Sequence, residues 1–214
     1  MKLPFKLDDF LQVFRNYNTA VFPIQIIFYC LAIIAVFLSF KKNQYSDRII
    51  SSALSFFWLW MGVIYHIIYF SSINKAAYFF GIVFIIQGLL FLWKGVYQKN
   101  LHFSFYPDIN GIMGSLLILF ALVFYPIISY LAGHAYPVTP TFGLPCPTTI
   151  FSFGILLFLK EKYSLWLLVI PFLWSLIGFS AAFSLGMKED TGLIIASILS
   201  CILLIRKKLM HEKN

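Results

Sequence analysis

A cysteine between two prolines offers this chain its most distinctive chemistry. Cys146 follows Pro145 and precedes Pro147, and Thr148 and Thr149 come next. Because proline suits the first position of a helix, the pattern predicts a helix that starts at Pro147, with Cys146 as its cap and both threonines in its first turn. A thiolate there could bind a soft metal, attack an electrophile or cycle between redox states. Alternatively, the turn only starts a helix, and Cys146 is a small buried apolar side chain.

Four other polar side chains are candidates to act with this cysteine: Gln25, His66, Gln87 and His134. They could contact a small solute together with Cys146 and the two threonines, and Cys146, His66 and His134 could ligate a metal ion. The alternative is that the buried ones form hydrogen bonds between helices, which is common for His and Gln in membranes.

Composition determines the class of element that must position these residues. Of 214 residues, 61% are hydrophobic and 11% are charged, whereas a soluble domain has roughly 25% charged residues. The apolar residues form continuous runs rather than alternating segments, which excludes a β-barrel in favour of an all-α, polytopic membrane protein. We expect seven membrane-spanning segments: Val21–Phe40, Ile49–Phe70, Ala76–Val96, Gly111–Leu131, Pro147–Leu159, Leu165–Ser184 and Thr191–Ile205.

Charge distribution predicts the orientation. With seven crossings, eleven of the sixteen Lys and Arg residues fall on the side of the C-terminus, so the positive-inside rule places the N-terminus outside and the C-terminus in the cytoplasm. Six crossings would place both termini on the same side of the membrane, and the Lys and Arg residues would no longer be separated in this way. The chain then forms one integral-membrane domain: an interfacial amphipathic helix at 1–18, a seven-helix bundle at 19–205 and a basic cytoplasmic tail at 206–214. The net charge of +8 fits this topology and an anionic bilayer, and we expect no nucleic-acid partner.

The fifth segment is too short to cross the bilayer alone. Pro147–Leu159 would be about 20 Å long, against a hydrocarbon core of about 30 Å. The proline-rich stretch before it must therefore descend into the membrane, which is tolerated where protein buries the backbone or where it lines a cavity. We expect an outward-facing pocket at the N-terminus of this half-helix, where free N–H groups would favour an anion or a thiolate.

Three stretches of the chain resemble a known family. FLQVFRNYNTAVFPIQ, WLWMGVIYHIIYFSSINKAA and above all PTFGLPCPTTIF are similar to domain-of-unknown-function family 6064, a bacterial and archaeal family of small membrane proteins. The resemblance covers nearly the whole chain, with Phe22 in place of Trp and Lys75 in place of Pro. It implies a multi-pass protein of the bacterial inner membrane, and it implies no activity and no cofactor.

Three functions remain open from the sequence. The first is a small-solute or metal-ion transporter or binding protein, since a half-helix is a good indicator of a membrane substrate site; a bundle this small would need a homo-oligomer for alternating access. The second is a membrane enzyme or thiol redox protein, with Cys146 as nucleophile and His66 or His134 as base. The third is an accessory subunit in which the proline turn is purely structural.

Overall fold

All regular elements of the described part of the chain are helices. The computed structural model describes residues 4–160, 163–187 and 190–211, which contain no β-strand. In chain order the α-helices are α1 (Leu7–Val21), α2 (Ile24–Phe40), α3 (Ser46–Trp60), α4 (Ala77–Phe91), α5 (Ile109–Leu119), α6 (Tyr125–Leu131), α7 (Pro145–Leu156), α8 (Trp166–Leu185) and α9 (Thr191–His211). Short π-helical segments continue α3, α4 and α5: η1 (Met61–Tyr69), η3 (Leu92–Tyr97) and η4 (Phe120–Phe124).

Four helical segments of the described chain are long and apolar enough to cross a membrane. They are Ser46–Ser72, Ala77–Tyr97, Ile109–Leu131 and Trp166–Leu185. α1 and α2 make a fifth if they count as one span bent by 85°. Length and composition thus establish an all-helical protein with four or five candidate spans, fewer than the seven predicted, because α7 is short and basic residues occupy the last turns of α9.

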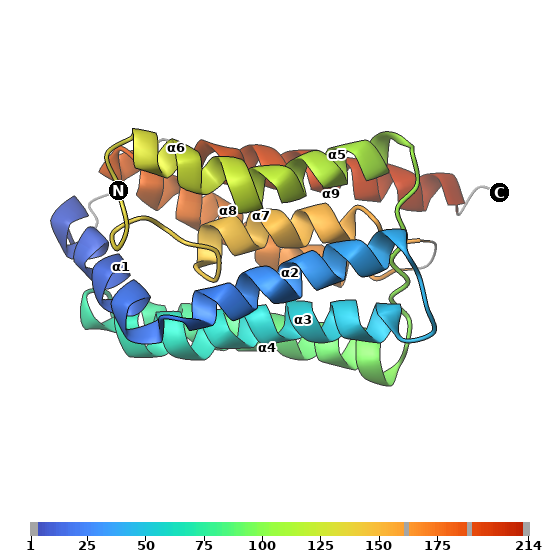
Figure 1. The fold of residues 1–214 in the computed structure, drawn as a ribbon, viewed down its shortest axis with the longest axis horizontal. Helices are drawn as coiled ribbons and strands as arrows, with labels where there is room; N and C mark the ends of the chain where they lie inside the picture. Colours follow the sequence, from blue (N-terminus) through green and yellow to red (C-terminus); the bar gives the residue numbers. More distant parts are fainter. Residues whose placement is uncertain (1–3, 161–162, 188–189, 212–214) are drawn as a thin grey trace.

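α7 lies in the middle of the bundle, surrounded by longer helices (Figure 1). It packs against α5, η4, α8 and α9, and every residue in it except Cys146 is buried. From α3, the indole N–H of Trp58 donates to Ser152 Oγ at 3.0 Å. A helix that is apolar on all sides and enclosed by other helices belongs to the core. The segment predicted as a span is therefore the helix around which the others pack.

Other segments satisfy the carbonyl groups that follow the last turn of α7. The Ser104 N–H donates to the Phe158 carbonyl at 2.9 Å. The ammonium of Lys207, on α9, donates to the Leu159 carbonyl at 2.6 Å. Carbonyls at a helix C-terminus have no partner within the helix and favour a nearby cation. Contacts from two other segments thus satisfy the carbonyls of Phe158 and Leu159 beyond the end of this short helix.

Most basic residues lie at this end of the bundle, where Asp47 connects two segments. Its carboxylate accepts the Phe103 N–H at 2.8 Å and lies 3.0 Å from both Lys42 Nζ and His102 Nδ1. The described basic residues of this end are Lys41, Lys42, Arg48, Lys94, Lys99, Lys160, Arg206, Lys207 and Lys208. Those described at the other end are Lys6, Arg15 and Lys75, whereas Lys2, Lys162, Lys188 and Lys213 lie outside the described residues.

Both predicted ends of the bundle need correction. The N-terminal helix, predicted for 1–18, is α1, which continues to Val21 because one apolar face reaches from Val13 to Val21 and packs on the bundle. It lies across one end of the other helices (Figure 1). At the other terminus, the predicted tail 206–214 is helical as far as His211. Lys and Arg are good helix formers and suit a helix C-terminus, so α9 continues beyond its apolar part. Residues 1–3 and 212–214 lie outside the described chain.

Candidate functional site

A loop fixed by α1 delivers the chain to the start of α7. The Asn18 side-chain amide donates to the carbonyls of Pro137 and Thr139 at 2.7 and 2.8 Å. The Tyr17 hydroxyl donates to the Gly143 carbonyl at 3.2 Å. Gly143 itself has φ +103°, a conformation that favours glycine. Buried backbone in this loop is therefore satisfied by side chains of α1.

α7 begins two residues earlier than predicted. Its first residue is Pro145 and its cap is Leu144, so Cys146 lies in the first turn rather than at the cap. Both prolines fit because the first turn of a helix does not use its N–H groups. Cys146 alone contributes an N–H among the first three residues, since proline has none, and the Thr148 N–H is bonded to the Leu144 carbonyl. The helix start is consequently a poor anion site, which corrects the expectation of several free N–H groups.

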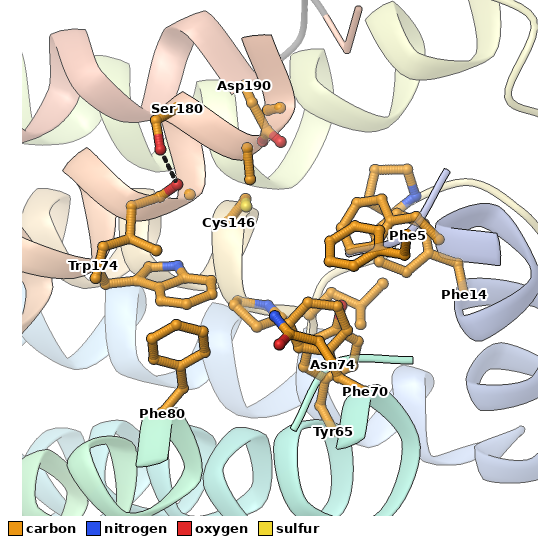
Figure 2. A pocket seen from close by; sticks show the side chains of 18 of the residues that line it. Phe5, Phe14, Tyr65, Phe70, Asn74, Phe80, Cys146, Trp174, Ser180 and Asp190 are labelled. Atoms are coloured by element: carbon orange, nitrogen blue, oxygen red, sulfur yellow. Dashed lines mark hydrogen bonds between the residues drawn. The ribbon is translucent and has the colours of Figure 1, made fainter. Parts of the chain in front are cut away.

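A cavity of about 280 Å³ adjoins this helix start (Figure 2). Its walls come from α1 and the residues just before it, from η1, the segment that leads into α4 and the start of α4, from the start of α6, from the start of α7 and the loop before it, from α8, and from the residue before α9. Most of the wall is apolar and aromatic: Pro4, Phe5, Phe10, Phe14, Tyr65, Phe70, Ala76, Phe80, Pro140, Leu144, Pro145, Pro147, Trp174, Ile177, Gly178, Ala181 and Ala182. Residues on α1 form the part of the wall that closes the cavity at the end of the bundle.

A few polar groups interrupt this apolar wall. Asp190 is 3% exposed and accepts a hydrogen bond from the Tyr125 hydroxyl. Trp174 is 8% exposed, and its indole N–H has no hydrogen-bond partner among the described residues. In Figure 2 the indole nitrogen lies on the side of the ring that faces Cys146. Asn74, Ser180 and Cys146 complete the polar lining. Such a cavity, apolar with a few placed polar groups, is typical of small-molecule sites.

Of the residues proposed from the sequence at the helix start, Cys146 lines the cavity and the two threonines do not. Thr148 is buried, and its hydroxyl accepts the Gly143 N–H at 2.9 Å. That bond holds the loop against the helix. Thr149 is also buried, and its hydroxyl has no partner among the described residues. Thr148 therefore has a structural contact that accounts for its presence.

His66 lies behind the wall of the cavity. It is fully buried on η1, with its ring centroid 4.5 Å from that of Phe84 and 5.0 Å from that of Trp174. Neither ring nitrogen has a hydrogen-bond partner among the described residues. Four of the rings around it line the cavity: Tyr65, Phe70, Phe80 and Trp174. The histidine is thus separated from Cys146 by aromatic side chains rather than paired with it.

The remaining three predicted residues lie away from the cavity. Gln25 donates to the Asn18 carbonyl at 3.0 Å, and Gln87 donates to the Leu167 carbonyl at 3.1 Å. Both bonds join separate helices or segments, as expected of intramembrane amides. His134 is half-buried in the loop after α6. The described residues contain no group of three or more His, Cys, Asp or Glu side chains placed to hold a metal ion.

The sequence pattern gave no signal for three important wall residues. Asp190 precedes α9 and resembles an ordinary helix cap, and Tyr125 and Trp174 are two of many aromatic residues in apolar helices. Whether these three side chains reach the cavity depends on how α6, α8 and α9 pack. Residue spacing within one helix does not determine this packing.

Fold and cavity together define a class, an all-helical protein with membrane-length helices and an apolar pocket at one end. Comparison with protein families matches residues 7–214 to a family of unknown function, DUF6064. Because the match covers nearly the whole chain, the chain belongs to this family. Neither the curated proteins nor the solved structures contain a match.

Proposed function

We propose that this protein is an integral membrane protein that binds a small amphipathic molecule in the cavity beside Cys146. The observation that carries the proposal is the cavity itself, whose walls are mostly apolar, with several aromatic rings, and whose polar groups are few. At about 30 Å³ for each water-sized group, a cavity of about 280 Å³ accommodates roughly nine non-hydrogen atoms. Trp174 lines the cavity, and its indole N–H is buried without a partner among the described residues.

The membrane topology belongs to the same proposal. Seven crossings, with α7 as the fifth, an external N-terminus and a cytoplasmic C-terminus, put the basic end of the bundle in the cytoplasm. The cavity then faces the outer side, beneath the interfacial helix α1. The bacterial inner membrane is the location that the family resemblance and the helices support.

The cavity also borders the surface that would meet lipid. Ile177 and Ser180 line it and are exposed on α8, a candidate span. Ala76, at the start of α4, is exposed as well. A molecule dissolved in the outer leaflet could enter between these two helices without crossing water. This favours binding of a membrane-soluble molecule over binding of a metal ion or a polar solute, and no histidine among the described residues lines the cavity to act as base for Cys146.

Thiol reactivity tests whether the cavity is open. In a variant with Cys30→Ala and Cys201→Ala, we expect Cys146 to react with methyl methanethiosulfonate in the folded protein, and 1-hexanol to slow the reaction. Filling the cavity with Ala181→Phe should also slow it. A variant that keeps only Cys30, which is exposed on α2, serves as control because hexanol should not protect it. If Cys146 reacts only after unfolding, or if neither hexanol nor Ala181→Phe changes its rate, the proposal is wrong.

A further inference from the structure

We infer that a groove between α2 and α5 binds an acyl chain of an anionic phospholipid, whose head group lies against Lys41 and Lys160. This site is separate from the cavity beside Cys146. It rests on the membrane location and orientation given under the proposed function, and it does not depend on that cavity. Three features support it: the place of the groove, the side chains that line it and the charge at its end.

The groove separates two helices that pack on other elements. α2 packs against α3, α5 packs against α7, and α7 lies between α2 and α5 (Figure 1). The groove has a volume of about 420 Å³. It follows α2 for about 10 Å, at 1.5 Å per residue, as far as the last residue of that helix, at the basic end of the bundle. Its lining residues are Ile33, Val36, Phe37, Phe40, Ser115, Ile118, Leu119, Leu122 and Val123.

These side chains suit a hydrocarbon chain better than another helix. Helices in membranes approach one another through small residues, as α5 and α7 do at Gly114 and Gly154, where a Cβ atom on Gly154 would lie 2.8 Å from the Gly114 carbonyl oxygen. Eight of the nine residues in the groove are Ile, Val, Leu or Phe instead. The ninth, Ser115, donates its hydroxyl to the Gly111 carbonyl at 2.9 Å. A flexible acyl chain can fit between such branched and aromatic side chains.

Lys41 provides an ammonium group at the end of the groove. It directly follows Phe40, the last residue of α2, and its Nζ lies 5.7 Å from the centroid of the Phe37 ring. Phe37 and Phe40 both line the groove. Because Lys41 is exposed, its ammonium group can contact a phosphate while its methylene groups lie along apolar surface.

Lys160 provides a second ammonium group near the same end. The Phe40 ring stacks on that of Phe105, with centroids 4.4 Å apart. The next residue, Tyr106, is exposed, and Lys160 Nζ lies 5.0 Å from the centroid of its ring. A hydrogen bond from Lys160 lowers the pKa of the Tyr106 hydroxyl, so ammonium and hydroxyl lie together. Both groups can donate to a phosphate.

The charge at this end of the bundle favours an anion. Of its described residues, nine are Lys or Arg and two are acidic, Asp47 and Asp108. Asp47 lies 3.0 Å from Lys42 Nζ, and Asp108 caps α5, whereas Glu161 and Glu212 lie outside the described residues. Basic groups between membrane helices on the cytoplasmic side attract anionic head groups, by about fivefold in affinity for each Lys or Arg.

Quenching of a bimane label by brominated phospholipids tests this inference. In a variant with Cys30→Ala, Cys146→Ala and Cys201→Ala, Leu119→Cys places the label in the groove, and Leu176→Cys places it on α8, outside the groove. The positions match because each follows the first residue of its helix by ten residues, and the two leucines are 44% and 43% exposed. The vesicles contain phosphatidylglycerol and phosphatidylcholine with the same chains, and only one of the two lipids is brominated.

We expect the preference for phosphatidylglycerol over phosphatidylcholine to be about 5- to 25-fold greater at the groove label than at the α8 label, for one or two lysine contacts. Lys41→Gln combined with Lys160→Gln should reduce the preference at the groove to that at α8. Lys94→Gln combined with Lys99→Gln removes the same charge from the same end, in and beside η3, and should leave the preference at the groove unchanged.

The outcomes distinguish this inference from the proposed function. An equal preference at the two labels refutes the inference, and this comparison does not require any lysine variant to fold. Quenching at the α8 label alone also refutes it, because a second copy or another protein would then cover the groove. If neither lipid quenches either label, the protein is not in the bilayer and the proposed membrane location fails. Protection of Cys146 by hexanol tests the cavity separately.

Discussion

The contact between α5 and α7 predicts a large effect for one added methyl group. At Gly154, a Cβ atom would lie 2.8 Å from the Gly114 carbonyl oxygen and 2.7 Å from Ile118 Cγ1. A carbonyl oxygen of the main chain cannot move without moving its helix. Gly154→Ala should therefore push α7 away from α5, and overpacking of this kind costs about 1–3 kcal/mol.

A matched variant isolates that cost from the change in helix propensity. Alanine is favoured over glycine inside a helix by about 1 kcal/mol, and this gain is common to every Gly→Ala change in a helix interior. At Gly178 on α8, the nearest atom to an added Cβ is Leu193 Cδ2, at 3.1 Å. This atom ends a flexible side chain that can adjust. We expect Gly154→Ala to be less stable than Gly178→Ala by about 1–3 kcal/mol.

Thermal unfolding in detergent micelles, followed by tryptophan fluorescence, can measure this difference. For a chain of this length, 1 kcal/mol corresponds to a Tm shift of roughly 2–4 °C, so the two variants should differ by about 2–12 °C. The reasoning is refuted if Gly154→Ala melts at or above the Tm of Gly178→Ala. In that case α5 and α7 separate at no cost, and the helix that carries Cys146 is not held in place by this contact.

Three other substitutions should each reduce the free energy of unfolding. Asp47→Ala leaves the Phe103 N–H without its acceptor and should cost about 1–3 kcal/mol, whereas Asp47→Asn should restore part of this in the same denaturation assay. Asn18→Ala removes the side-chain bonds that hold 137–141, and we expect faster proteolysis in that loop with the rest of the protein intact; unchanged cleavage there would count against the anchoring role. Asp108→Ala removes the N-cap of α5 and should lower stability by about 1 kcal/mol, and a Tm equal to wild type would contradict it.

The sequence predicted the helical class and the short helix because both depend on local features. Continuous apolar runs indicate membrane helices, and the prolines beside Cys146 interrupt a helix wherever they occur. The exact start of α7 was less predictable, because Pro145 and Pro147 both suit a first turn. Choosing between them requires the position of the loop residue Gly143, which bonds to Thr148.

The walls of the cavity were less predictable than its cysteine. Cys146 was identified because its neighbours in sequence are unusual, whereas Asp190 and Trp174 reach the cavity through the packing of α8 and α9. The same limit applies to His66: its depth in the bundle could be estimated from the sequence, but not the direction of its side chain, which lies between Phe84 and Trp174. Facing directions depend on helix rotation, which one amino-acid sequence with uniformly apolar helices does not define.

The enclosure of α7 has a consequence for how the chain assembles during synthesis. Helices that face lipid can insert singly and associate later, but α7 is too short to cross the bilayer without the loop before it and has almost no exposed surface. Part of its enclosure comes from α8 and α9, which are synthesised after it. In a chain truncated before α8, α7 should therefore remain partly exposed and be recognised by quality-control proteases. Synthesis of α8 and α9 would complete its burial.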